Sequence, residues 1–192
     1  MGIVTAAAGR RDGYQVPVAF AEAGLLAAHV TDQYLPDALQ PLLERFAKAG
    51  ALEQLRQLSR RHHPQLPSRL VHCSRRLVLT KFVQRLQPAW RQRWSDDQDP
   101  ISWSALRLAR QQEAALLLHM GYAHHAFMAE PLQQRRRGLV QYHPHIAESA
   151  RILQEDLERY PELSDAREQL LVDAQDFTNR EELERADLVI CN

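Results

Sequence analysis

Histidines flank a proline at residues 143–145, where an apolar stretch ends and a helical pattern begins, and a further pair, His124 and His125, follows another apolar stretch. Neutral imidazole carries one hydrogen-bond donor and one acceptor, which match a sugar hydroxyl, and it is also a ligand for Zn²⁺. A shared metal would require both pairs to converge. We therefore predict no metal site and favour hydrogen bonding to a polyol by His124, His125, His143 and His145. Exposed histidines without a role are the simpler alternative.

A glycine-bearing loop reads GRRDGYQ and follows the first apolar stretch. Its backbone N–H groups could approach a phosphate or a sugar hydroxyl closely. It is not the G-x-G-x-x-G dinucleotide pattern. A turn that needs glycine for its backbone angles has the same spacing, and spacing alone favours that explanation. The substrate-binding candidates in this loop are Gly9, Arg10, Arg11, Gly13, Tyr14 and Gln15.

Basic residues concentrate in the middle of the chain. Lys plus Arg equals Asp plus Glu at 24 each, yet the segment from Arg56 to Arg93 contains ten basic residues and no acidic one. The segment lacks the interleaved aromatic residues of a base-stacking platform, so we expect no nucleic-acid partner. A basic amphipathic stretch could instead lie on an anionic membrane surface, and a solvated basic face packed on the sheet explains it equally well. The membrane-surface candidates are Arg75, Arg76, Lys81 and Arg85.

Several catalytic classes have no sequence motif here. The chain contains no G-x-S-x-G, no Walker loop and no Cys-x-x-Cys, which leaves hydrolase, nucleotide-triphosphatase and thiol-redox chemistry without an anchor. Cys73 and Cys191 lie in apolar surroundings and are expected to be reduced, buried thiols of a cytosolic protein. No segment approaches the roughly 18 apolar residues of a membrane span, so we expect a cytoplasmic location, peripheral to the inner membrane face if the basic segment binds lipid.

Short apolar runs alternate with helical patterns along the whole chain. The runs predict strands at 3–8, 25–32, 67–73, 114–120, 138–143 and 187–191. Helices are predicted from between Asp12 and Val16 to Gly24, and at 38–48, 52–60, about 103–112, 144–160, about 165–177 and 178–186. Asp12 and Gln15 have the spacing of a capping box. The helix at 144–160 has one apolar stripe, made by Ile146, Ala150, Leu153, Leu157 and Tyr160.

This alternation predicts an α/β fold: one domain over residues 1–192, with an open, mostly parallel Rossmann-like sheet and helices on both faces. Ligands of such sheets bind beyond the carboxyl ends of the strands, where the strand order reverses. The loops in that position are rich in Arg, Tyr, Gln and His. The chain ends on a strand where the pattern calls for another helix, which suggests one half of a longer protein.

The segments GRRDGYQVPVAFAEAGLLAAHVTDQYLP, RRHHPQLPSRLV, YAHHAF, QYHPH and ADLVICN together resemble the N-terminal domain of bacterial family-four glycosyltransferases, which have the two-domain GT-B fold. The resemblance implies an acceptor-side domain for a carbohydrate or a lipid-linked acceptor. It also implies a nucleotide-sugar co-substrate bound mainly by a C-terminal Rossmann-like domain, retention of configuration and no separate cofactor.

The resemblance further implies that the loop from Gly9 to Gly13 lines the interdomain cleft and that His143 faces the transferred sugar as the catalytic candidate. This sequence has GRRDG in place of the commoner Gly-Gly loop, and His-Pro-His in place of the frequent His-Asp. Arg10 and Arg11 would suit a phosphate-bearing or acidic acceptor, and they could equally pair with Asp12. The alternative function is a non-catalytic Rossmann-like module that docks on an anionic membrane or a polyanion through its basic segment.

Overall fold

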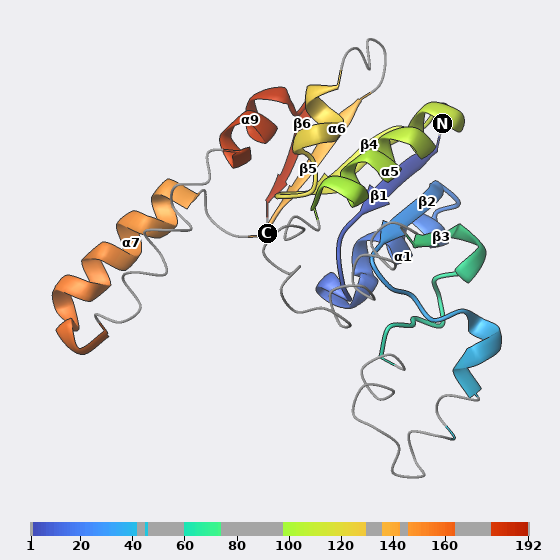
Figure 1. The fold of residues 1–192 in the computed structure, drawn as a ribbon, viewed down its shortest axis with the longest axis horizontal. Helices are drawn as coiled ribbons and strands as arrows, with labels where there is room; N and C mark the ends of the chain where they lie inside the picture. The colour runs from blue at the N-terminus through green and yellow to red at the C-terminus, as the bar shows by residue number, and fades with distance from the viewer. Residues whose placement is uncertain are drawn as a thin grey trace, which may run out of the picture.

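Six parallel strands form one open sheet in the computed structural model, which describes residues 2–41, 45, 60–73, 98–129, 136–142, 146–163 and 178–191 (Figure 1). The strand order is β3-β2-β1-β4-β5-β6. The strands are β1 (Ile3–Ala6), β2 (Leu26–Thr31), β3 (Val71–Cys73), β4 (Ala115–His119), β5 (Arg137–Gln141) and β6 (Leu188–Cys191). The predicted α/β fold with a parallel Rossmann-like sheet is confirmed.

Each strand lies within its predicted apolar run or within one residue of it. The central strands are buried on both faces, which is why their sequences are nearly continuous in apolar character rather than alternating. Val4 of β1 pairs with Ala28 on one side and with Leu116 on the other. The predicted first strand ends earlier than expected, at Ala6, because the chain then leaves the sheet into the glycine-bearing loop.

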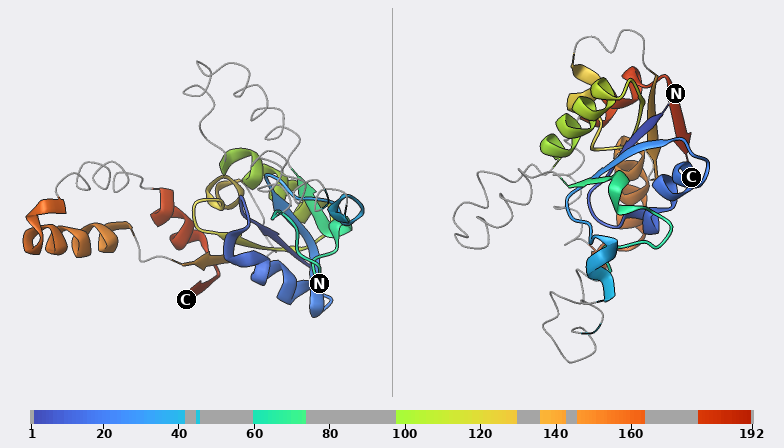
Figure 2. Two further views of the ribbon diagram at one scale, coloured as in Figure 1. Left: turned by 90° about the horizontal axis from the view of Figure 1, so that it is seen from below. Right: turned by 90° about the vertical axis from the view of Figure 1, so that its right-hand side faces the viewer.

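Helices cover both faces of the sheet, as Figure 2 shows. Helix α1 (Gln15–Glu22) lies on one face, and α5 (Gln98–Gln111), α6 (His124–Met128) and α9 (Thr178–Arg185) lie on the other. The larger core cluster joins α5 and α6 to the sheet through Val4, Ala6, Leu106, Leu118, Phe127 and Leu139. Helix α5 includes Pro100, so the helix already exists before the predicted start at residue 103. A proline is tolerated in a first turn, because the N–H that it lacks has no partner there.

Helix α7 (Ile146–Arg159) is amphipathic, as predicted, but it extends away from the sheet (Figure 1). Of the predicted stripe, Leu153 and Leu157 are half-buried and Tyr160 is 47% exposed. Ion pairs from Arg151 to Glu148 and Glu155, three and four residues away, support the helix. Short 3-10 helices are η1 (Arg11–Tyr14), η2 (Asp37–Leu39), η3 (Ser68–Leu70) and η5 (Pro161–Leu163).

Both cysteines are free and exposed, so the expectation of buried thiols is wrong. Cys73 and Cys191 end β3 and β6, the two outer strands in the order of the sheet. A local apolar sequence does not reveal that a strand lies at an edge, where neighbours cover it less.

Several predicted features lie outside the described residues. These are most of the helix at 38–48, all but the last residue of the helix at 52–60, the helix at 165–177, the basic residues Arg75, Arg76, Lys81 and Arg85, and the corner of His143, Pro144 and His145. Among the helices that are described, none has the length and apolar character that crossing a bilayer requires.

Candidate functional site at the carboxyl edge of the sheet

The strand order reverses between β1 and β4. From β1 the chain proceeds outward to β2 and β3 and then returns to the other side of β1 as β4. At such a reversal the loops that follow the two central strands diverge, and a ligand can enter between them. The residues after β1, β2, β4 and β5 therefore meet at one edge of this sheet, and they form the candidate site.

The glycine-bearing loop after β1 is held by Asp32, at the end of β2. The Gly9 N–H donates to Asp32 Oδ1 at 2.7 Å, and Arg61 Nη1 lies 3.7 Å from the same oxygen. Gly9 has a φ of +73°, and a Cβ added there would lie 2.7 Å from Arg61 Nη1. The positive φ thus favours glycine at this position, and a Cβ there would force the Arg61 guanidinium to shift.

The rest of the loop is a tight left-handed turn. Asp12, Gly13 and Tyr14 have φ values of +49°, +62° and +67°. No side chain caps α1, so the predicted capping box is wrong. Asp12 instead forms a hydrogen bond with Tyr142, after β5; burial, and after it this hydrogen bond, raises the Tyr142 pKa. Asp12 therefore contacts a residue that follows a different strand, and it does not cap the helix next to it in the sequence.

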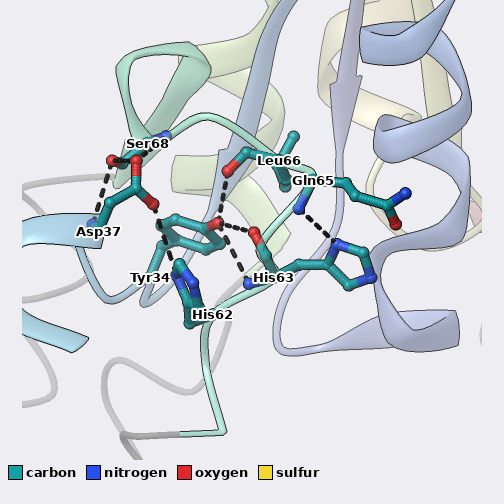
Figure 3. Close-up of polar contacts among 7 residues, drawn as sticks. All are labelled: Tyr34, Asp37, His62, His63, Gln65, Leu66 and Ser68. Atoms are coloured by element: carbon teal, nitrogen blue, oxygen red, sulfur yellow. Dashed lines mark hydrogen bonds and ion pairs between the residues drawn. The ribbon is translucent and has the colours of Figure 1, made fainter. Parts of the chain in front are cut away.

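Tyr34 fixes the segment that carries Arg61 (Figure 3). Its hydroxyl donates to the Leu66 carbonyl oxygen at 2.7 Å and accepts the His63 N–H at 3.3 Å. The Leu35 N–H donates to the Arg61 carbonyl oxygen at 2.7 Å. Tyr34 also packs edge-on against Tyr14, with ring centroids 5.6 Å apart. These contacts place the Arg61 segment beside the glycine-bearing loop.

A polar array lies beside Tyr34 and consists of Ser68, Asp37 and His62 (Figure 3). Ser68 Oγ donates to Asp37 Oδ2 at 2.6 Å, which lowers the Asp37 pKa, and His62 Nδ1 lies 3.6 Å from Asp37 Oδ1. The carboxylate stands between the hydroxyl and the imidazole. A nucleophilic serine needs the imidazole as its direct partner, so this array closes a turn rather than activating Ser68.

Buried polar groups lie on the α1 face of the sheet. Thr5 pairs in register with His29 of β2 and with Leu117 of β4, and His119, two residues after Leu117, points to the same face. Thr5 Oγ1 and His29 Nδ1 share a hydrogen bond at 2.9 Å. The Tyr14 ring stands edge-on to His29, with centroids 5.8 Å apart. In this part of the described chain an apolar sheet face is therefore interrupted by hydrogen-bonding groups.

Both imidazoles in this group are held neutral. Burial lowers the pKa of His29 to about 3 and that of His119 to about 4. Burial also raises the pKa of Tyr14 to about 12. Within the described residues, His29 Nε2, His119 Nδ1 and the Tyr14 hydroxyl have no hydrogen-bond partner. Buried polar atoms without partners are rare in native proteins, so these three are candidates to contact a bound polar molecule.

Aromatic side chains link the loops after β4 and β5 to this edge. Tyr142 stacks on His119, with ring centroids 5.1 Å apart and planes at 24°. The Arg11 guanidinium carbon lies 5.8 Å from the centroid of the Tyr122 ring, within the range of a cation–π contact. The loops after β1, β4 and β5 thus touch one another through side chains.

The predicted pair His124 and His125 begins α6, and both imidazoles contact side chains of other helices. His124 Nε2 lies 2.7 Å from Glu181 Oε2, and the His125 ring stacks on Trp103 with centroids 6.0 Å apart. In the described ranges no three His, Cys, Asp or Glu side chains are grouped closely enough to hold a metal ion.

The structure brings the predicted residues of the glycine-bearing loop together, but it does not present them equally. Arg10, Arg11 and Gln15 are exposed, whereas Tyr14 is buried in the core. Sequence reasoning missed Asp32, Arg61, His29, His119 and Tyr142. Position in the sequence could have identified three of them, because polar residues at the end of a predicted strand lie where ligands of such sheets bind; these are Asp32, His119 and Tyr142. Nothing local marked Arg61, which lies 29 residues beyond Asp32.

Comparison of this chain with protein-family models, with curated proteins and with solved structures found no match.

Proposed function

We propose that this chain is the acceptor-side domain of a glycosyltransferase, which moves a sugar from a nucleotide-sugar to a carbohydrate or lipid-linked acceptor with retention of configuration. The observation that carries the proposal is the group of neutral hydrogen-bonding side chains at the switch point. His119, with its unpartnered Nδ1, stacks on Tyr142, which in turn bonds Asp12 of the glycine-bearing loop. A neutral imidazole suits a sugar hydroxyl, because it offers one donor and one acceptor without a charge.

In the proposed reaction, an acceptor hydroxyl oxygen forms a bond to the anomeric carbon while the bond from that carbon to the donor phosphate breaks. The departing phosphate takes the hydroxyl proton, so no protein base is required. The protein then contributes placement and electrostatic stabilisation. A second, donor-binding domain completes this scheme. The exposed Arg10 and Arg11 add positive charge at the entrance, which favours an acceptor that carries phosphate or carboxylate.

The test is turnover by the full-length protein that contains this chain, assayed with a panel of nucleotide-sugars and a mixture of lipid-linked and free glycan acceptors. Release of the nucleoside diphosphate that depends on the acceptor supports the proposal. His119→Asn is expected to reduce turnover by about 10²-fold at saturating donor, the scale on which a positioned polar contact acts.

His72→Asn is the matched control, because His72 is an exposed histidine on the outer strand β3. It should leave turnover unchanged. Thermal melts of both variants separate a loss of contact from a loss of fold. Failure of the wild-type protein to bind or turn over any nucleotide-sugar in the panel would overturn the assignment.

A further inference from the structure

Glu182 of α9 carries a buried carboxylate, and in the sequence it lies far from the residues of the candidate site. Its residue exposure is 0%. Burying a carboxylate is unfavourable unless hydrogen bonds compensate, so such a group has a specific partner set. Burial raises the pKa of Glu182, whereas the hydrogen bonds that its carboxylate accepts from three backbone N–H groups lower it.

The three partners are backbone N–H groups in the turn after β4. Gly121 donates to Oε2 at 2.8 Å, Ala123 donates to Oε1 at 3.0 Å, and His124 donates to Oε1 at 2.8 Å. Gly121 has a φ of +85°, so the turn adopts a conformation that favours glycine. The carboxylate therefore fixes both residues that flank Tyr122.

Tyr122 is consequently held from both sides. Its own N–H donates to the His119 carbonyl oxygen at 2.9 Å, which ties the turn to the end of β4. Its ring lies beneath the guanidinium of Arg11, 5.8 Å from centroid to carbon. Arg11 belongs to the glycine-bearing loop, and it is exposed at the edge where a ligand would enter. A continuous chain of contacts thus runs from α9 to that loop.

We propose that Glu182 is a positioning residue, whose carboxylate clamps the turn after β4 and, through the Tyr122 ring, sets where the Arg11 guanidinium lies. Its kinetic consequences rest on the proposed function, whereas its structural consequences do not. An isolated arginine on a flexible loop samples many rotamers. Stacking on a ring that is itself fixed reduces that freedom before a ligand arrives.

The first test uses NMR on the protein without any ligand. Glu182→Gln removes the negative charge with little change in shape. It should shift the backbone amide signals of Gly121, Ala123 and His124 and, at a distance, the Arg11 side-chain signals. Glu181→Gln is the matched control, since this neighbouring carboxylate is exposed and contacts only the ring of His124 among the hydrogen bonds described above. It should leave the Arg11 signals unchanged.

Tyr122→Leu tests the second link, because it keeps the clamp and removes the ring. It should shift the Arg11 signals as Glu182→Gln does. When Glu182→Gln is introduced together with Tyr122→Leu, the amide signals of Gly121 and Ala123 should shift as they do when Glu182→Gln is introduced alone. If Glu182→Gln does not fold, Glu182→Asp, which keeps the charge on a shorter arm, replaces it. Arg11 signals that are unaffected by both changes, at Glu182 and at Tyr122, overturn the proposal.

The second test is kinetic and uses the full-length protein. Glu182→Gln should raise the KM for the acceptor about tenfold with little change in kcat, because Arg11 acts on binding. In an Arg11→Ala background the same change should alter KM less than about twofold, since the two residues act through one chain of contacts. Equal effects in both backgrounds mean that Glu182 is merely structural. If the wild type has no transferase activity, the proposed function fails, and the NMR outcome still decides the role of Glu182.

Discussion

At the scale of single residues, the candidate site depends on close contacts between the backbone of the glycine-bearing loop and side chains from other parts of the chain. Gly9 illustrates this, because two independent constraints apply to it. Its φ is +73°, and Arg61 Nη1 occupies the space in which a side chain would begin. Gly24 has a φ of +68°, and no atom lies within 4 Å of the position that a Cβ would occupy there, so it provides a natural comparison.

Gly9→Ala and Gly24→Ala should each lower the free energy of unfolding by about 1 kcal/mol, the order expected for a left-handed residue with a Cβ. Only Gly9→Ala should also displace Arg61, whose flexible end can move away. In denaturant titrations, Gly9→Ala and Arg61→Ala should therefore be non-additive, while Gly24→Ala and Arg61→Ala should be additive. Additivity of the first pair would show that the contact between Gly9 and Arg61 has no energetic role.

The buried imidazoles of His29 and His119 predict a dependence of stability on acidity. In the unfolded chain a histidine titrates near its ordinary pKa of about 6.5, whereas in the fold the pKa falls to about 3 for His29 and about 4 for His119. Between these values the unfolded state binds more protons. Stability is therefore complete above about pH 6.5 and decreases as the pH falls toward 4.

The groups that face His29 are Thr5, Tyr14 and His119, and those that face His119 include Asp12, Arg11 and Tyr142. Each histidine should contribute a slope of at most about 1.4 kcal/mol per pH unit. Urea titrations from pH 7.5 to 4.5 measure it. His29→Gln should reduce the slope, and the exposed His72→Gln should not. An unchanged slope in His29→Gln would show that His29 is not buried in neutral form.

At the scale of elements, several side chains hold the Arg61 segment, and among them the Tyr34 hydroxyl bonds its backbone at both His63 and Leu66. The Tyr34 hydroxyl bonds Leu66 and His63, 32 and 29 residues away (Figure 3), and none of these three residues lies in a helix or a strand. The segment is therefore expected to detach locally when this hydroxyl is lost, without unfolding of the sheet.

Tyr34→Phe should lower the free energy of unfolding by about 1–3 kcal/mol, because it leaves a buried carbonyl and an N–H without their partner. Amide hydrogen exchange should accelerate at His63 and at Leu35, whose N–H bonds the Arg61 carbonyl oxygen. Exchange in β1 and β4 should change only by the global loss of stability. Tyr160→Phe, at a tyrosine that is 47% exposed, is the control. Unchanged exchange at His63 would mean that the segment is held by other contacts.

At the scale of the whole molecule, burial is concentrated in the centre of the sheet. Leu118 of β4 is fully buried, whereas Leu188 of the outer strand β6 is 58% exposed. Helices α5, α6 and α9 lie on one face (Figure 2). The same residue type should therefore contribute very differently at the two positions.

Leu118→Ala should reduce the free energy of unfolding by about 2–5 kcal/mol, since it removes buried methyl groups and leaves a cavity. Leu188→Ala should reduce it by about 0.5 kcal/mol or less, as expected for an exposed position. Chemical denaturation of the two variants beside the wild type measures both values. A large loss for Leu188→Ala would show that β6 is covered in solution.

The sequence by itself determined the fold class and the positions of the strands. Apolar runs such as AALLLHM and LLAAHVTD identify buried parallel strands, because each run is continuously apolar over a few residues and such runs alternate with helical patterns along the chain. The sequence also placed the glycine-bearing loop at the carboxyl edge, since a loop that follows a parallel strand begins at the carboxyl end of that strand. It did not separate edge strands from central ones, which is why Cys73 and Cys191 were expected to be buried.

Only the tertiary structure decided which polar side chains meet. Asp32 reaches Gly9 across 23 residues, and Glu182 reaches Gly121 across 61. Such pairs depend on the register of neighbouring strands and on where a helix packs against the sheet. Neither produces a periodic pattern of residues in the sequence. Tyr14 shows the same limit from the other side. Its place in a loop predicted a ligand contact, and only the structure shows that the left-handed turn directs its ring into the core beside His29 and leaves its hydroxyl as one of the buried groups without a hydrogen-bond partner among the described residues.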